Sequence, residues 1–322
     1  MMKPQFLRQS SKKFQQPRRN NLFKEFKNLG WSDNIQSKTT FNFLLSASKQ
    51  IHSNQILLDL GAGECRYNFF FAHCHYVSVD FGKGDKKWDF SKLDILGDIT
   101  KLDFIRDNSI DFCLNTVTLE HINEPQRFFR EVARILKPGG KLFLYAPFIV
   151  AEHQVPYDFF RYTSYGLRYL SEQGGLKVVS LIPSNGPLST GISLVHYSLQ
   201  IAAGRNIPVK GILLIFRILF TSLLPIFDKL EFHLQKHKFP LNWLLVAEKK
   251  GTHNKSRRYA SKQEAINSII CCPSCRGKLK PLNDLILCSH CGNKFSKNGN
   301  QLNFLDIINP SKVQIRNKSI PL

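Results

Sequence analysis

The sequence predicts an α/β protein: a Rossmann-like, mostly parallel sheet with a helical insertion, followed by a small cysteine-rich domain. Three observations predict it. Short apolar strands alternate with helical patterns, the first strand runs into a glycine turn, and two close cysteine pairs lie near the C-terminal end. Strand–helix alternation indicates a parallel sheet with helices on both faces. Ligands of such sheets bind beyond the carboxyl ends of the strands.

Buried parallel strands are expected wherever a short apolar run ends in a polar or turn-forming residue. Such runs lie at 56–60, 76–80, 94–99, 109–115 and 141–147, of which 94–99 is the least clear, and further strands are expected at 177–184 and 241–250.

The clearest helical pattern is 125–137, where Phe128, Val132 and Ile135 recur on one face. Pro125 suits its first turn, and the Pro-Gly-Gly that follows stops it.

The charge is uneven along the chain. The protein has 45 Lys and Arg against 24 Asp and Glu, but residues 51–150 are nearly neutral, so the excess lies in the flanks. Basic flanks predict contact with a polyanion, such as nucleic acid, an anionic membrane surface or an acidic glycan. Solvated, disordered ends would give the same composition. Residues 1–30 are predicted to be a basic, disordered tail, and they lack the apolar run of a secretory signal, so we expect a cytoplasmic protein.

The turn LLDLGAGECRY, residues 57–67, predicts a ligand site. Gly61 and Gly63 let the backbone turn sharply and approach a ligand. A dinucleotide fingerprint needs a third glycine where Arg66 stands, and a pyrophosphate would be repelled by Asp59 and Glu64. S-adenosylmethionine has a sulfonium and an ammonium instead, so nearby acids favour it. Asp80 ends the next expected strand, about 20 residues after Gly61, where a carboxylate can accept hydrogen bonds from both ribose hydroxyls.

The stretch from about 56 to 175 resembles the class I S-adenosylmethionine-dependent methyltransferases, specifically the type 11 group. The segments that carry the resemblance, in the family's order, are LLDLGAGECRY, VSVDF, GDITKLDF, DNSIDFCLNTVTLEHINEPQRFFREVARILKPGGKLFLYAPF and HQVPYDFFRYTSYGLRYL. The resemblance implies that the two glycines lie under the methionine part of the donor and Asp80 holds the ribose. It also implies that Asp98 and Ile99 lie at the adenine and that Asn115 lines the site. The residues expected at the donor are Asp59, Gly61, Gly63, Asp80, Asp98, Ile99 and Asn115.

One departure from the family pattern is Cys65, which stands where the family often has a third glycine. The thiol is small, but it leaves the path of the loop open. For any single carboxylate of this region, a loop hydrogen bond or a helix cap is the alternative role.

The segment AEHQVPYDFFRYT, residues 151–163, is where this fold usually closes over its substrate. His153 is the preferred general base, because an imidazole titrates near neutral pH. A structural or substrate-orienting role is its alternative. Asp158 and Arg161 are further catalytic candidates, or else a structural ion pair at helical spacing. His121 is expected to be a structural, hydrogen-bonding residue.

A helical insertion is expected at about 186–239, before a last strand that in the family lies antiparallel at the sheet edge. Its apolar part, residues 211–227, is shorter than the roughly 20 residues that span a bilayer. Two interpretations stay open: a lid over the active site, or a helix lying in a membrane interface.

The two cysteine pairs, C-x2-C each, predict a structural zinc site. The expected ligands are Cys272, Cys275, Cys288 and Cys291, with Cys271 as a spare that could compete with Cys272. The module resembles small zinc-ribbon proteins that bind and activate methyltransferases of tRNA and translation factors. It is expected either to dock on its own catalytic domain or to stand free.

These patterns divide the chain into domains. The predicted domains are a tail at 1–30, a methyltransferase domain at 31–250, a linker at 251–267, a zinc ribbon at 268–308 and a second tail at 309–322.

The favoured function is methyl transfer to a glycan or lipid-linked small acceptor at the inner membrane face. It follows from the apolar insertion, the basic flanks, and the likeness of PYDFFRYT to methyltransferases of bacterial surface-polysaccharide pathways. The alternatives are a methyltransferase of RNA or of a translation-related protein, with the ribbon as activator, and an inactive binding protein. Nucleic acid is less favoured, because aromatic and basic residues do not interleave as they do where bases stack.

Overall fold

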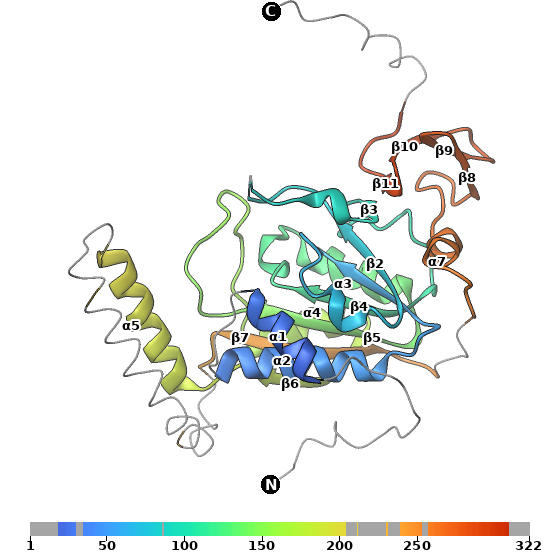
Figure 1. Ribbon diagram of the computed structural model, residues 1–322. Helices are drawn as coiled ribbons and strands as arrows, with labels where there is room; N and C mark the ends of the chain where they lie inside the picture. The colour runs from blue at the N-terminus through green and yellow to red at the C-terminus, as the bar shows by residue number, and fades with distance from the viewer. Residues whose placement is uncertain are drawn as a thin grey trace, which may run out of the picture.

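The computed structural model describes residues 19–29, 35–85, 87–203, 239–252 and 257–308, with the single residues 211 and 230. Its described strands form one eleven-stranded sheet in the order β6-β7-β5-β4-β1-β2-β3-β11-β10-β9-β8 (Figure 1). The strands are β1 Ile56–Leu60, β2 His75–Asp80, β3 Ile95–Leu96, β4 Ile110–Thr116, β5 Leu136–Pro147, β6 Leu176–Pro183, β7 Asn242–Lys249, β8 Leu279–Leu282, β9 Leu285–Cys288, β10 Lys294–Asn298 and β11 Gln301–Asn303. The helices are α1 Arg19–Asn28, α2 Ile35–Gln50, α3 Pro125–Ile135, α4 Ser164–Gln173, α5 Pro187–Ala203 and α7 Lys262–Ile269, with single turns η2 Asn68–Phe71, η3 Phe90–Lys92 and η4 Leu119–His121.

The predicted α/β Rossmann-like fold is confirmed. Strands β1 to β5 pair in parallel, and β1 is buried at every position between β2 and β4. Strand β7 is antiparallel to both of its neighbours, as predicted. Its expected place at the sheet edge is wrong, because β7 lies between β5 and β6 and β6 forms the edge. Strand β7 is buried over its first six residues, whereas β6 is buried only at Leu176 and is exposed or half-buried at its other positions.

Helices cover both faces of the sheet, and each face has its own core. Side chains of α1, α2 and η2 pack on one face against β1, β4, β5 and β7. Side chains of α3, α4 and α7 pack on the other. Helix α3 begins with Pro125 and buries Phe128, Val132 and Ile135 on the predicted face. The carboxyl ends of β1, β2 and β4 therefore emerge between two packed layers, and the loops that follow them form the candidate site.

The prediction of a disordered tail over 1–30 is wrong for residues 19–28, which form helix α1. Leu22 and Phe26 are buried, and the ring of Phe26 packs 5.5 Å from Phe41 of α2 and 6.1 Å from Phe70 of η2. The two apolar residues are four positions apart, so they share one helix face although basic residues surround them. Residues 1–18 lie outside the described part of the chain.

The insertion is helical where it is described. Helix α5 stands apart from the sheet, at the left of Figure 1. Its base is held by Asn185 and Thr190, whose side chains lie 2.7 Å apart, and Thr190 donates to the carbonyl of Phe239 at 2.7 Å. Apart from residue 211, the segment 211–227 lies outside the described residues. Among the described helices, none is both long and apolar enough to cross a membrane.

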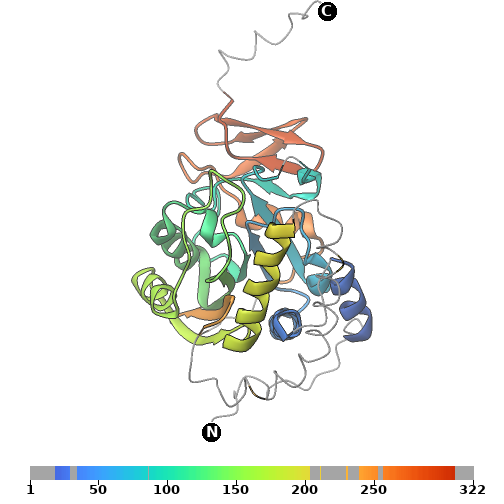
Figure 2. The ribbon, with the colours of Figure 1, turned by 90° about the vertical axis from the view of Figure 1, so that its left-hand side faces the viewer.

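The cysteine-rich module continues the main sheet, because β11 pairs in parallel with β3 (Figures 1 and 2). The predicted linker 251–267 is too long at its C-terminal side, since helix α7 begins at Lys262. Ser261 caps the helix by accepting from the amide of Glu264 at 3.2 Å, and the Glu264 carboxylate accepts from the amide of Ala260, just before the cap, at 2.7 Å. Ala265, Ile266 and Ile269 of α7 are buried in the core.

Candidate active site

The glycine turn follows β1 and is closed by its neighbours. Gly61 and Gly63 have φ values of +78° and +52°, in the region that only glycine adopts freely. The amide of Gly61 donates to the carbonyl of Val79 at 2.8 Å, so the turn bends toward β2. A Cβ at Gly61 would lie 2.2 Å from Cγ2 of Thr118, whose hydroxyl donates to the Gly61 carbonyl at 3.0 Å. Both the backbone angle and the space at position 61 therefore require glycine.

Cys65 takes the backbone conformation that a third glycine would have. Its φ is +57°, its amide donates to the carbonyl of Ala62 at 2.8 Å, and its side chain is buried. The backbone at position 65 therefore has the left-handed conformation that a glycine would adopt, although the residue is a cysteine. Its Cβ makes this conformation less favourable than it would be for glycine.

Asp80 ends β2, and its carboxylate accepts hydrogen bonds from the backbone amides of two glycines. One carboxylate oxygen accepts from the amide of Gly63 at 2.9 Å, and the other accepts from the amide of Gly82 at 2.8 Å. Burial raises the pKa of Asp80, while these amides, which stabilise the charged form, act against the rise. Each carboxylate oxygen can accept a second hydrogen bond. The group can therefore keep the turn in shape and still accept from the two hydroxyls of a ribose.

Asn115 lies at the end of β4, directly beside the turn. Its amide nitrogen donates to the carbonyl of Leu60 at 2.7 Å. Its Oδ1 is buried and has no hydrogen-bond partner among the described residues. Because buried acceptors are normally satisfied, this oxygen fits a ligand that donates hydrogen bonds.

The other residues that were predicted to bind the methyl donor have contacts within the protein. Asp98 accepts from the amide and the hydroxyl of Thr100 at 2.8 and 2.7 Å, and Ile99 is buried. Asp59 is buried and accepts from the hydroxyl of Tyr76 at 2.6 Å. Burial raises the pKa of Asp59 to about 7 despite this hydrogen bond. The turn, Asp80 and Asn115 are brought together, whereas Asp59 and Asp98 each bond a neighbour through one carboxylate oxygen, and Oδ1 of Asp59 has no hydrogen-bond partner among the described residues.

The loop after β5 brings His153, Asp158 and Arg161 together, as their spacing predicts. The two terminal guanidinium nitrogens of Arg161 donate to the Asp158 carboxylate at 2.6 and 2.7 Å. This pairing holds the pKa of Asp158 well below its usual range. Asp158 also accepts from the backbone amide of His153 at 2.9 Å. Asp158 and Arg161 therefore shape the loop that carries His153.

Glu120 is a site residue that the sequence reasoning missed. Its side chain is fully buried, and Nε2 of His121 and Nε2 of His153 both lie 3.7 Å from its Oε1. The proximity of Glu120 raises the pKa of His153, so more of that imidazole is protonated near neutral pH and less of it is free to accept a proton than in an unperturbed histidine. The sequence did give one sign of this role: Glu120 lies next to His121 in the turn Leu119–His121 (the LEH turn), shortly after the strand predicted at 109–115.

The four cysteines of the two pairs lie in one cluster. The sulfurs of Cys272 and Cys291 are 3.6 Å apart, and those of Cys275 and Cys288 are 3.5 Å apart. A tetrahedral zinc ion with bonds of about 2.3 Å separates its sulfurs by about 3.8 Å, so the donor set fits zinc. A Cβ at Gly277 would lie 3.1 Å from two of these sulfurs, so glycine leaves the cluster its room. Cys271 points elsewhere, 3.4 Å from the carbonyl of Asp103.

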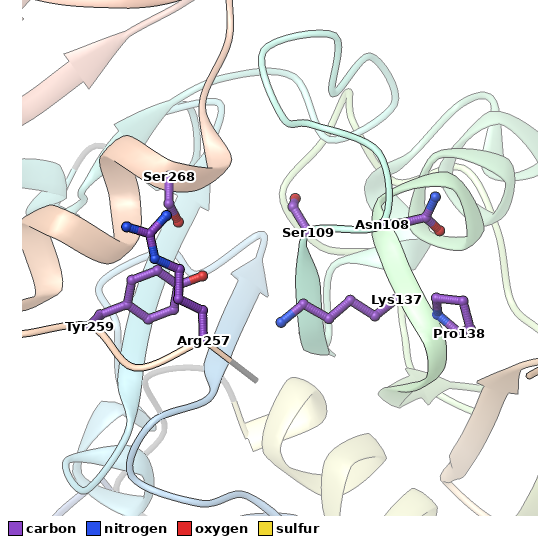
Figure 3. Close-up of a pocket in the computed structure, with 7 residues that line it drawn as sticks. All are labelled: Asn108, Ser109, Lys137, Pro138, Arg257, Tyr259 and Ser268. Atoms are coloured by element: carbon purple, nitrogen blue, oxygen red, sulfur yellow. The ribbon is translucent and has the colours of Figure 1, made fainter. Parts of the chain in front are cut away.

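A pocket of about 520 Å³ lies away from the glycine turn (Figure 3). Ser109, which lines it, directly precedes β4, so the pocket is at the amino ends of the parallel strands. Lys137 reaches into it and pairs with Asp111 at 2.7 Å, while Arg257 lies over the ring of Tyr259. Because ligands of such sheets bind at the carboxyl ends, this pocket is not the candidate active site.

Together, the sheet, the glycine turn and Asp80 at the end of β2 define a Rossmann-like methyltransferase fold. Residues 58–144 match the family model described as "Methyltransferase domain". The match runs from within β1 to within β5 and supports an S-adenosylmethionine-dependent methyltransferase.

Known proteins resemble parts of this chain. A demethylmenaquinone methyltransferase of Renibacterium salmoninarum is 36% identical over 125 residues, which are 36% of this chain. The match spans 50% of that relative's length. A solved complex of the Haloferax volcanii Trm112 methyltransferase activator with a methyltransferase has a TM-score of 0.44 at 16% identity, covering 72% of this chain and 97% of the other. Phosphoethanolamine N-methyltransferase 2 of Haemonchus contortus has a TM-score of 0.39 at 16% identity, covering 66% and 53%.

Proposed function

We propose that the protein is an S-adenosylmethionine-dependent methyltransferase. One observation carries the proposal: a buried carboxylate at the end of β2, Asp80, bonded to the amides of the glycine turn at 2.9 Å and of the following loop at 2.8 Å. The family match over residues 58–144 supports the same activity.

The residues present fit the donor. Asp80 would accept from the ribose hydroxyls, and the bare backbone at Gly61 and Gly63 would approach the methionine part. The Oδ1 of Asn115, which has no hydrogen-bond partner among the described residues, would accept a hydrogen bond from the amine of S-adenosylmethionine. When bound, S-adenosylmethionine supplies a methyl group activated by its sulfonium. The protein's part is to align an acceptor with that methyl group and to exclude water.

We propose a lipid-linked or other partly apolar acceptor, a glycan precursor included, at the inner membrane face. The loop after β5 exposes Val155, Tyr157 and Phe159, with exposed fractions of 73%, 52% and 45%. The loop also touches the LEH turn, since the amide of Phe159 donates to the carbonyl of Glu120 at 2.9 Å. Exposed apolar side chains grouped beside a site indicate a binding surface. The relative's name, demethylmenaquinone methyltransferase, also concerns a small-molecule acceptor.

A second candidate is an RNA or protein acceptor. The net charge of +21 and the docked cysteine-rich module favour it. An RNA acceptor predicts affinity that falls steeply with salt.

Calorimetry with purified full-length protein tests the donor. We expect binding of S-adenosylmethionine and of its demethylated product, and a loss of both in Asp80→Ala. Asp85→Ala, an exposed acid in the same loop, should bind like the wild type. A wild-type protein without affinity for either compound, or an Asp80→Ala variant with full affinity, contradicts the proposal.

Labelled S-adenosylmethionine and cell extract identify the acceptor. The protein is incubated with separate lipid, RNA and protein fractions, and we expect label in the lipid fraction. Val155→Ser and Phe159→Ser should reduce this labelling while donor binding stays unchanged. Label in RNA or protein alone would support the second candidate. Donor binding without label in any fraction would favour an inactive binding protein.

A further inference from the structure

We propose that Glu120, His121 and His153 form a divalent-metal site beside the glycine turn, distinct from the four-cysteine cluster. The three residues come from two segments: the LEH turn after β4 and the loop after β5. One ligand atom from each can be chosen so that all three lie within 4.8 Å of one another. The proposal does not rest on methyl transfer, because it concerns only these side chains.

Both histidines are oriented as metal ligands are. Nδ1 of His121 lies 2.7 Å from the carbonyl of Tyr157, and Nδ1 of His153 lies 3.0 Å from the carbonyl of Ala151. A carbonyl only accepts, so each Nδ1 carries the hydrogen and each neutral ring has its lone pair on Nε2. A backbone carbonyl on one ring nitrogen and a metal on the other is the usual arrangement of a ligating histidine.

The two Nε2 atoms converge on a buried carboxylate. Each lies 3.7 Å from Oε1 of Glu120, which is longer than a hydrogen bond. A neutral ring in this orientation turns its Nε2 lone pair toward the carboxylate, and the two repel each other. A cation held among the three groups removes this repulsion. Ligands about 2.1 Å from one metal lie about 3.0–3.4 Å apart, so each Nε2 is only a few tenths of an ångström too far from Oε1.

Among the described residues, Glu120 has no hydrogen bond that would compensate for the burial of its carboxylate. Its side chain is fully buried, and within the described part of the chain neither carboxylate oxygen has a hydrogen-bond partner. The same holds for Nε2 of His121. Arg161 is the nearby fixed cation, but it is bound to Asp158 at 2.6 Å. An ionised carboxylate is costly to bury unless it is paired or coordinates a metal.

A second layer of contacts holds the ligands in place. The backbone amides of Phe159 and Phe160 donate to the carbonyl of Glu120 at 2.9 and 3.2 Å. The hydroxyl of Tyr162 donates to the carbonyl of Leu119 at 3.0 Å. Arg161 donates to the carbonyl of Ala151, the residue whose carbonyl also orients His153. The loop and the turn are thus fastened together where the ligands meet.

The donor set of two imidazoles and one carboxylate suits Zn²⁺, Fe²⁺ or Mn²⁺. Three protein ligands leave coordination positions for water or for an oxygen of another molecule. The site adjoins the glycine turn, because Thr118, two residues before Glu120, donates to the Gly61 carbonyl.

The test uses Mn²⁺ added to the zinc-loaded, full-length protein, with the free ion followed by electron paramagnetic resonance. Thiolates select softer metals, so Mn²⁺ separates this site from the cysteine cluster. We expect one Mn²⁺ per chain, and affinity at least about tenfold weaker in Glu120→Gln and His153→Ala. Glu152→Gln and His52→Ala, exposed residues of the same types, should bind like the wild type.

Zinc analysis and calorimetry make the outcome decisive. Wild-type protein that takes up neither Mn²⁺ nor zinc beyond the single ion of the cysteine cluster overturns the proposal, as does unchanged Mn²⁺ affinity in both ligand variants. If Glu120→Gln does not fold, His153→Ala decides, since His153 is on a surface loop and only partly buried. S-adenosylmethionine binding is measured on the same samples, so failure of the metal site and failure of the proposed function are distinguishable.

Discussion

Gly61 is the residue at which the turn tolerates least change. Its φ is +78°, and a Cβ there would lie 2.2 Å from Thr118. Gly299 has a φ of +58° but no heavy atom within 4 Å of its would-be Cβ. The two positions thus share a backbone constraint and differ in available space.

Alanine should separate these two effects. We expect Gly61→Ala to lower the free energy of unfolding by about 2–5 kcal/mol, because backbone strain and overpacking add. Gly299→Ala should cost about 1–2 kcal/mol, from strain alone. Urea denaturation measures both. Equal losses would mean that Thr118 moves aside freely.

The pKa of Asp59, raised to about 7 by burial, predicts a pH-dependent stability. Between about pH 4 and pH 7 the folded state keeps this proton and the unfolded state does not, so its contribution to stability falls as pH rises. In Asp59→Asn this fall is absent. The free energy of unfolding of the variant relative to wild type should therefore rise by about 1.4 kcal/mol per pH unit across this range, and level off above pH 7.

Denaturation of both proteins from pH 4 to pH 8 measures the difference. Asp85→Asn, an exposed acid, should show no such slope. A flat difference for Asp59→Asn would mean that Asp59 is ionised throughout in the folded protein.

Cys271 and Cys272 are neighbours with different roles. The Cys271 thiol donates to the carbonyl of Asp103 at 3.4 Å, while the sulfur of Cys272 lies 3.6 Å from that of Cys291. Cys271→Ser should therefore keep one zinc ion per chain, and Cys272→Ser should lose it. Elemental analysis of the purified variants measures this, and zinc loss in Cys271→Ser would place that residue among the ligands.

Strand β11 is the element that joins the cysteine-rich module to the catalytic half. The amide of Leu302 donates to the carbonyl of Asp94 at 2.8 Å, and the amide of Phe304 donates to the carbonyl of Leu96 at 2.9 Å. The ring of Phe304 stacks on that of Phe104, with centroids 4.8 Å apart and planes 4° from parallel. Backbone pairing and ring packing thus act at the same junction.

Phe304→Ala should loosen this junction, since removing a core phenylalanine costs about 3–5 kcal/mol. Hydrogen exchange at the amides of Leu302 and Phe304 should accelerate, while the amides of β1 and β4 stay protected. Ile307→Ala, at a half-exposed position, is the control. Unchanged exchange in Phe304→Ala would show that the strand pairing alone holds the module.

At the scale of the whole molecule, periodicity predicted the parallel strands and helix α3, because each depends on local pattern, whereas the antiparallel direction of β7 came from the resemblance to the family. The place of β7 between β5 and β6 depends on which strands meet in space, and no local pattern encodes that. Helix α1 was missed because only two residues, Leu22 and Phe26, bury it among basic neighbours.

The candidate site divides in the same way. The glycine turn and Asp80 follow from a strand ending in a turn, so sequence was enough to bring them together. Glu120 was missed because an acid in a turn is usually solvated, and its burial depends on a loop more than 30 residues further along the chain. The hydrogen bond from Tyr76 to Asp59 likewise depends on a partner that only the fold supplies, whereas Asp98 bonds Thr100, two residues further along the chain.

The pairing of β11 with β3 also has a consequence for how the molecule responds to dilution. Two separate chains that shared such an edge would part as their concentration fell. A covalent tether instead fixes the local concentration of one partner around the other, whatever the amount of protein present. The cysteine-rich module should therefore stay on its edge in nanomolar as in micromolar solution, a permanence that a freely diffusing helper protein does not have.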